Sequence, residues 1–195
     1  MSALATAEVG SRGALTHHRR SPAGTAAVLV PVVLAVALTA WRYDAKPLWR
    51  DEVYTLTTAG RGFAEMLELL AVRDAGLVGY YALMNPWLAL GEAPAWMRLP
   101  GALATPVAVG LCAAIGRRVG GPTTALVGGV LVALTPSVVR HAQEARPYPL
   151  VLAAVALTAL LLLRAGARPT ARQRTAVAAT AAVAVALHPL VALPA

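Results

Sequence analysis

The sequence predicts an all-α polytopic membrane protein. Hydrophobic residues make up 58% of the 195 residues, charged residues make up 13%, and the mean hydropathy is +0.64. Soluble domains rarely have this composition, because they need charged surface to face water. The net charge of +8 does not indicate nucleic-acid binding, since the basic residues form clusters that flank apolar segments. The single cysteine, Cys112, excludes a disulfide framework within the chain.

Five uncharged segments predict about five transmembrane helices. Each can cross ~30 Å of hydrocarbon, where ~20 residues are needed, if the shorter ones borrow a turn from their flanks. A sixth apolar segment, Gly76–Leu90, contains polar and aromatic residues and is short for a span, so we expect it on the membrane surface. The five predicted spans are Gly24–Trp41, Pro100–Gly116, Gly120–Val139, Pro149–Leu163 and Thr175–Pro194.

The distribution of charge predicts the topology. With five spans and the N-terminus inside, the inner side receives nine of the 17 basic residues and one of the nine acids, Glu8. The outer side receives eight of each, which is the asymmetry that membrane insertion favours. We therefore expect a basic cytoplasmic tail (1–23) and a transmembrane module (24–195) with a long first outer loop (42–99) and a short second outer loop (140–148).

The first outer loop is predicted to contain interfacial helices that form a small, half-buried cap. Between Phe63 and Leu70, apolar side chains fall on one helical face, while Glu65 and Glu68 lie on another. Gly76–Leu90 would be the second helix of this cap, with Asp74 in the turn before it. All ten aromatic residues lie in or at the edge of the two outer loops, as an interfacial belt or as stacking surfaces for sugar rings.

Acidic residues in the first outer loop are candidates for chemistry. Asp51 and Glu52 are adjacent and follow the first predicted span. A carboxylate can accept a proton from a hydroxyl nucleophile. The pair could instead stabilise the N-terminus of an interfacial helix, where the helix dipole favours acids. Asp74 could bind a substrate or serve as a turn residue only.

The second outer loop places two guanidinium groups, an imidazole and a carboxylate at the bilayer surface. Arginine suits phosphate because its planar fork donates two hydrogen bonds at once. Both arginines could instead only anchor lipid headgroups. His188, near the outer end of the last span, could be a ligand, although ordinary packing is the simpler interpretation. The candidate residues of this loop are Arg140, His141, Gln143, Glu144, Arg146 and Tyr148.

Four motifs, taken in order, resemble the N-terminal part of bacterial mannosyltransferases of the GT-C class. They are similar to the family 39 protein-mannosyltransferases and the lipid A aminoarabinose transferases, and the resemblance covers roughly Gly24 to the C-terminus. Relatives commonly carry a His shortly after the aspartate that matches Asp74, and this chain has none there. Relatives also continue with further spans, so we expect a truncated form of the module. The motifs are Leu48–Thr55, Asp74 with Gly79–Met84, Met97–Leu103 and Gln143–Tyr148.

The resemblance implies transfer of a sugar from a polyprenyl-phosphate carrier to a glycan, lipid or protein acceptor. The site would face outward from the cytoplasmic membrane. Asp51 would be the base on the acceptor hydroxyl with Glu52 as its supporting neighbour, and Glu144 would help the acceptor or a metal. Arg146 would meet the donor phosphate. The other expected substrate-binding residues are Asp74, Tyr80, Tyr81, Arg98, Arg140, His141, Gln143 and Tyr148.

Two other functions remain open at this point. A non-catalytic or truncated subunit that binds the lipid carrier or a partner protein is consistent with the short chain and the missing His. A transporter fragment would carry ionisable residues in the middle of its spans, and these are absent, so transport ranks last. A divalent cation could bind the carboxylates together with a lipid phosphate, although no spacing demands one. The sequence specifies neither the sugar nor the acceptor.

Overall fold

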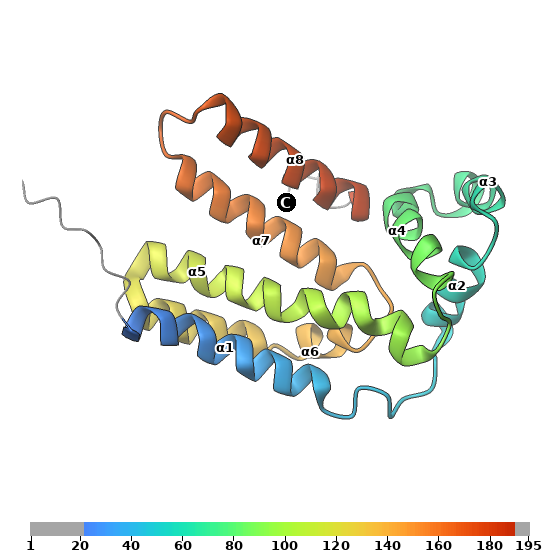
Figure 1. Cartoon of the computed structure of the whole chain (residues 1–195), viewed down its shortest axis with the longest axis horizontal. Helices are drawn as coiled ribbons and strands as arrows, with labels where there is room; N and C mark the ends of the chain where they lie inside the picture. Colours follow the sequence, from blue (N-terminus) through green and yellow to red (C-terminus); the bar gives the residue numbers. More distant parts are fainter. Residues whose placement is uncertain (1–21, 190–195) are drawn as a thin grey trace, which may run out of the picture.

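The protein is all-α. The computed structural model describes residues 22–189 and contains helices and no strand in that range. Helices α1, α5, α7 and α8 run side by side, while α2, α3 and α4 gather at one end of them (Figure 1). The elements are α1 (Pro22–Ala40), α2 (Arg50–Ala59), α3 (Phe63–Arg73), η1 (Ala75–Leu77), α4 (Val78–Leu88), α5 (Pro94–Leu134), α6 (Pro136–Ala142), α7 (Tyr148–Ala165) and α8 (Ala171–Leu187).

Three of these helices, α1, α5 and α7, are long and apolar enough to cross a membrane. The predicted spans Gly24–Trp41 and Pro149–Leu163 match α1 and α7 to within two residues at each end. The predicted span Thr175–Pro194 overlaps α8, but its residues from 190 onward lie outside the described residues. The predicted basic tail lies outside them as far as residue 21. The all-α fold is therefore confirmed, with three helices of a length and composition that suit a membrane, while the five-span topology stays a prediction.

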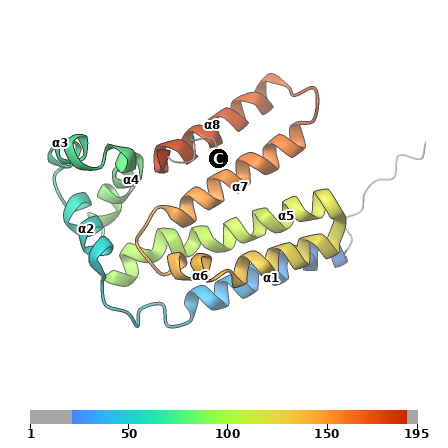
Figure 2. The same ribbon diagram turned by 180° about the vertical axis from the view of Figure 1, so that it is seen from behind.

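Two predicted spans, Pro100–Gly116 and Gly120–Val139, fall on the two arms of α5, which meet at an elbow. The second prediction runs too far, because this arm ends at Leu134 and residues 136–139 belong to α6. Gly120 and Gly121 leave helical geometry at the elbow, and Gly121 has φ +79°, a conformation that favours glycine. Pro122 follows and begins the second arm, where its fixed φ suits a first helical position. The second arm then runs back along α1 toward α6 (Figure 2).

Small residues let the two arms approach each other and α1. A Cβ added at Gly116 would lie 2.9 Å from the Thr124 carbonyl oxygen, and one added at Gly129 would lie 2.6 Å from Cγ of Pro31. Real Cβ atoms do not approach this closely, so only glycine fits at either position. Close backbone packing of this kind is typical of helices in lipid, where dispersion replaces the hydrophobic effect as the driving force.

Helices α7 and α8 are joined by a hydrogen bond between their middles. The Thr158 hydroxyl donates to Oγ1 of Thr180 at 2.9 Å. Helix α8 begins with a capping box, in which the Gln173 amide donates to Oγ1 of Thr170 and the Thr170 amide donates to Oε1 of Gln173. The threonine hydrogen bond links α8 to α7, whereas the capping box stabilises the start of α8 itself.

Helices α2, α3 and α4 form a compact cap with the largest cluster of buried apolar side chains in the described residues. In α3, Met66 and Leu70 are buried one turn apart, while Phe63 and Leu67 are exposed. The cap also contacts the end of α8, because a Cβ added at Gly79 would lie 2.2 Å from the Ala186 carbonyl oxygen. The cluster extends across α2, α4, α5, the α6–α7 loop and α8 through Ala59, Leu77, Tyr80, Tyr81, Met84, Leu88, Met97, Ala145 and Leu187.

A pair of tryptophans closes the connection between α4 and α5. The Trp87 and Trp96 rings stack with centroids 4.4 Å apart. Each indole N–H donates to the other residue's carbonyl oxygen, at 2.9 and 3.0 Å. These two aromatic residues therefore use their polar groups inside the protein, and they fix the angle at which α5 leaves the cap.

Candidate functional site

The adjacent carboxylates Asp51 and Glu52 lie in the first turn of α2, where the helix dipole favours negative charge. Successive residues of a helix point about 100° apart, so the two side chains face different surroundings. The Glu52 side chain is 1% exposed and points into the protein, whereas the Asp51 side chain is 39% exposed. The two acids therefore belong to two different clusters.

Glu52 forms a buried, two-pronged ion pair with Arg98 at the start of α5. Nε of Arg98 donates to Oε1 and Nη2 donates to Oε2, both at 2.8 Å, and the Arg98 side chain is 1% exposed. The guanidinium also donates to the backbone carbonyl oxygens of Lys46 at 3.1 Å and Pro47 at 3.3 Å. The pair thus joins α2, α5 and the loop after α1.

The same carboxylate holds the second outer loop in place. The Ala145 amide donates to Oε1 of Glu52 at 2.9 Å. One turn along α2, the Thr55 hydroxyl donates to the carbonyl oxygens of Ala145 at 3.2 Å and of Asp51 at 3.1 Å. Both backbone polar groups of Ala145, the amide and the carbonyl, are therefore hydrogen-bonded to side chains of α2, a grip on the loop from two sides. The neighbours of Ala145, Glu144 and Arg146, are positioned by this grip.

Asp51 faces Arg146 on the open side of α2. Nη2 of Arg146 lies 3.6 Å from Oδ2 of Asp51, and the Arg146 side chain is only 13% exposed. Its guanidinium carbon lies 5.8 Å from the centroid of the Tyr148 ring. Burial lowers the pKa of Arg146, but Tyr148 and then Asp51 more than offset this, so the guanidinium stays charged.

Two buried polar atoms beside this pair lack a hydrogen-bond partner among the described residues. They are the Tyr81 hydroxyl and Nε of Arg146. Burial, and then the Asp74 carboxylate, raises the pKa of Tyr81 above its ordinary value, which keeps the phenol protonated. The nearby Thr55 hydroxyl opposes this rise in pKa, but the Tyr81 hydroxyl does not meet it in hydrogen-bonding geometry. Buried polar groups are rarely left unpaired, so these two atoms have hydrogen-bonding capacity that the described residues do not use.

Asp74 lies at the junction of α3 and η1 and is half-buried. Its carboxylate lies near enough to Tyr81 to raise the pKa of that phenol. Tyr80 is buried within the core cluster, and its ring packs edge-on against that of Tyr81 at 5.5 Å. Asp51, Asp74, Tyr81 and Arg146 together form the open cluster.

A second group of charged side chains surrounds Glu144 at the end of α6. Nε of Arg140 donates to Oε1 of Glu144 at 2.9 Å, and Nδ1 of His141 lies 2.9 Å from Oε2. The His141 ring packs on Tyr148 with centroids 4.5 Å apart, and Tyr148 lies 5.9 Å from the His188 ring. Tyr148 therefore touches both this group and Arg146 of the open cluster.

Gln143 faces away from both clusters and holds the C-terminal end of α1. Its side-chain amide donates to the carbonyl oxygens of Leu38 and Thr39 at 3.2 Å and of Trp41 at 2.7 Å. The last carbonyls of a helix have no partner within it, so a donor from elsewhere satisfies them. Gln143 thus uses its donors on the protein itself, as Arg98 does.

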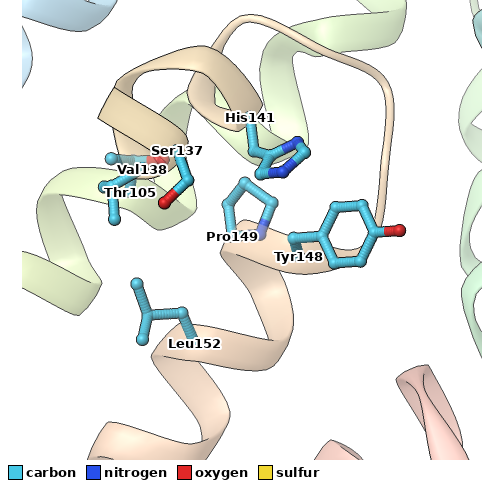
Figure 3. A pocket seen from close by; sticks show the side chains of 7 residues that line it. All are labelled: Thr105, Ser137, Val138, His141, Tyr148, Pro149 and Leu152. Atoms are coloured by element: carbon cyan, nitrogen blue, oxygen red, sulfur yellow. The ribbon is translucent and has the colours of Figure 1, made fainter. Parts of the chain in front are cut away.

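A pocket of about 190 Å³ opens beside His141 and Tyr148, between α5, α6 and α7. Figure 3 shows the His141 ring above Pro149 and the Ser137 hydroxyl directed into the pocket, while the Tyr148 hydroxyl points away from it. Thr105, Val138 and Leu152 complete the lining. Among residues 22–189, no three His, Cys, Asp or Glu side chains come close enough to hold a metal ion.

Sequence reasoning did not identify Thr55, Trp49, Thr105 or Ser137. Thr55 lies one helical turn after Asp51, and this spacing is the signal that could have revealed it. The Trp49 ring contacts the guanidinium of Arg140, and the central guanidinium carbon lies 5.4 Å from the centroid of the Trp49 ring. Thr105 and Ser137 lie within apolar segments and carry no signal in the sequence.

Comparisons with known proteins give no match: no protein family, no curated protein and no solved structure is similar to this chain.

Proposed function

We propose that this chain is a membrane glycosyltransferase of the mannosyltransferase type. It would move a sugar from a polyprenyl-phosphate donor to a glycan, lipid or protein acceptor on the outer face of the cytoplasmic membrane. The observation that carries this proposal is the open cluster. It combines a half-exposed carboxylate, a largely buried guanidinium and a buried phenol with no partner in residues 22–189, next to helices long and apolar enough to cross a membrane.

The open cluster offers the groups that this transfer needs. The acceptor oxygen bonds to the anomeric carbon as the bond from that carbon to the phosphate oxygen breaks. Asp51 takes the proton of the acceptor hydroxyl, and the electron pair leaves on the phosphate. Arg146 holds that phosphate, as fixed cations do in poorly hydrated sites. The Tyr81 hydroxyl donates to an oxygen of the donor.

The distance between Asp51 and Arg146 supports these separate roles. A direct charge-assisted hydrogen bond between such groups measures about 2.7–2.9 Å. The observed 3.6 Å is longer, and Nε of Arg146 remains unpaired. A phosphate oxygen can therefore accept a hydrogen bond from the Arg146 guanidinium without breaking a tight ion pair. The Asp51 carboxylate is then free to act on the acceptor.

Glu52 and Arg98 support the site without touching the substrate. All four polar contacts of the Glu52 carboxylate are made by the protein: two by Arg98, one by the Ala145 amide and a longer one by the Trp49 amide. Glu52 is therefore a positioning residue, which keeps α2 and the second outer loop in register. In this proposal Glu144 acts next to the pocket, since its Oε2 lies 2.9 Å from Nδ1 of the pocket-lining His141.

The proposed topology has five spans and an inner N-terminus. The two arms of α5 would cross separately, and α8 would be the fifth span. The cap and the α6–α7 loop lie at one end of the long helices, while the α5 elbow and the α7–α8 loop lie at the other (Figure 1). The second end carries arginine and no described carboxylate, as expected for a cytoplasmic face.

Replacing Asp51 by Asn tests the proposal. The protein would be purified in detergent and given a polyprenyl-phosphate mannose with a labelled sugar, followed by other hexoses and aminoarabinose on the same carrier. We expect transfer to fall by about 10²–10⁴-fold, the usual contribution of a general base, while carrier binding persists. Glu65→Gln is the matched control, because the Glu65 side chain on α3 is exposed and forms an ion pair with the exposed Arg61.

A different outcome would support the alternative function. If the wild-type protein binds the carrier but transfers none of these sugars, the chain is a binding subunit and not a transferase. If Asp51→Asn transfers sugar as fast as wild type, Asp51 is not the base and the proposed mechanism is wrong.

A further inference from the structure

The end of the molecule opposite the cap, here named the basic end, carries six arginines. None of the six forms an ion pair with a carboxylate among residues 22–189. Nη1 of Arg118 donates to the Leu163 carbonyl oxygen at 3.3 Å, which ties the α5 elbow to the end of α7. The six residues are Arg117, Arg118, Arg164, Arg168, Arg172 and Arg174.

A cleft of about 410 Å³ lies at the basic end between the last turn of α7 and the first turns of α8. Arg164 comes from α7 and Arg172 from α8, so guanidinium groups line it from both sides. Leu161 and Ala176, one turn further into the helices, give it an apolar floor. A charged rim above an apolar floor matches an amphiphile better than a fully hydrated ion.

The placement of charge on α8 is unfavourable for the helix alone. The helix dipole is positive at the N-terminus, where acids are normally preferred. Helix α8 instead has Arg172 and Arg174 in its first turn and no acid there. A bound anion at this position would offset both the dipole and the repulsion between arginines.

We propose that the cleft between α7 and α8 binds the phosphate-bearing headgroup of an anionic lipid, with Arg164 and Arg172 as its two guanidinium clamps. The planar fork of each arginine donates two hydrogen bonds to phosphate oxygens. The acyl chains continue along Leu161 and Ala176 between the helices. This site is independent of the proposed transferase, since it lies at the opposite end of the molecule.

The test is lipid binding by the full-length protein, measured by native mass spectrometry from detergent. The probes are phosphatidylglycerol, phosphatidylcholine of the same acyl chains, and millimolar inorganic phosphate. We expect Arg164→Gln with Arg172→Gln to weaken phosphatidylglycerol binding by roughly tenfold or more, given the usual attraction of each arginine to an anionic headgroup. The charge-matched control is Arg168→Gln with Arg174→Gln, which leaves the cleft lining intact.

Each outcome decides the proposal. Stronger loss in the cleft variant than in the control, with weak phosphatidylcholine binding, supports it. Equal loss in both variants shows diffuse attraction without a site, and displacement of the lipid by inorganic phosphate shows a site for free anions; either result overturns it. Thermal unfolding in detergent checks both variants, and if the double variant does not fold, the same comparison is made with Arg172→Gln against Arg174→Gln.

Discussion

The acids of two arginine–carboxylate pairs, Glu52 with Arg98 and Asp51 with Arg146, are neighbours on one helix, yet the pairs differ in burial, distance and hydrogen bonding. Glu52 and Arg98 are each 1% exposed and meet through two hydrogen bonds of 2.8 Å. Asp51 and Arg146 lie 3.6 Å apart, the Asp51 side chain is 39% exposed, and one guanidinium nitrogen has no partner in the part of the chain that the structure describes. The first pair is saturated by the protein, and the second is not.

This difference distinguishes a pair that stabilises the fold from a pair that could act on a substrate. A buried ion pair can repay the cost of leaving water only when its geometry is good and its remaining polar atoms are bonded. Glu52 and Arg98 meet this condition and have no capacity left for a substrate. The Asp51 side chain is 39% exposed, and Nε of Arg146 forms no hydrogen bond within the described residues, so this pair keeps unused capacity. The saturated pair holds the loop that carries the unsaturated one.

The largest effect on stability is expected from breaking the saturated pair. Glu52→Gln leaves the buried Arg98 charge uncompensated and should lower the free energy of unfolding by about 3–5 kcal/mol. Replacing both residues together, as Glu52→Leu with Arg98→Leu, should cost less than Glu52→Gln alone. The unfolding midpoint in detergent measures both. An unfolding midpoint like that of wild type in Glu52→Gln would remove the distinction between the two pairs.

A smaller effect is expected from loosening the link between the pairs. Thr55→Val removes the hydrogen bond to the Ala145 carbonyl oxygen and should cost about 1 kcal/mol of stability. If this grip positions Arg146, donor binding should also weaken by several-fold. Thr57→Val is the control, since Thr57 is exposed and its hydroxyl donates to the carbonyl oxygens of Val53 and Tyr54 in the same helix. Equal donor affinity in both variants would show that Arg146 does not depend on the grip.

The sequence predicts the fold class and most helices because apolar composition and length are local properties. It predicts two separate spans, Pro100–Gly116 and Gly120–Val139, which correspond to the two arms of α5 on either side of Gly120 and Gly121. It does not predict that the second arm ends at Leu134 and that α6 begins at Pro136, inside the second of these spans. It identifies Asp51, Glu52, Arg98 and Arg146 as candidates, but it cannot pair them. Pairing is a long-range property: Arg98 is 46 residues from Glu52, and the direction in which each side chain points decides the partner.

Gln143 shows the same limit for a single residue. In the sequence it is a polar residue in a polar loop, indistinguishable from its neighbours. Only the folded chain shows that its amide satisfies three carbonyl oxygens at the end of α1. A polar side chain in a candidate loop therefore indicates function only after its bonds within the protein are known.

The smallest effect on stability, and the sharpest test of unused capacity, is expected from Tyr81→Phe. The Tyr81 hydroxyl is buried and has no partner among the described residues, and removing such a group costs little or is slightly stabilising. The unfolding midpoint should thus stay the same or rise. If the hydroxyl donates to the bound donor, sugar transfer or donor affinity should nevertheless fall by several-fold. Tyr80→Phe, on the buried neighbour, is the matched control. A loss of stability in Tyr81→Phe would mean that the hydroxyl is bonded inside the protein and that the cluster around Asp51 is as saturated as the pair around Glu52.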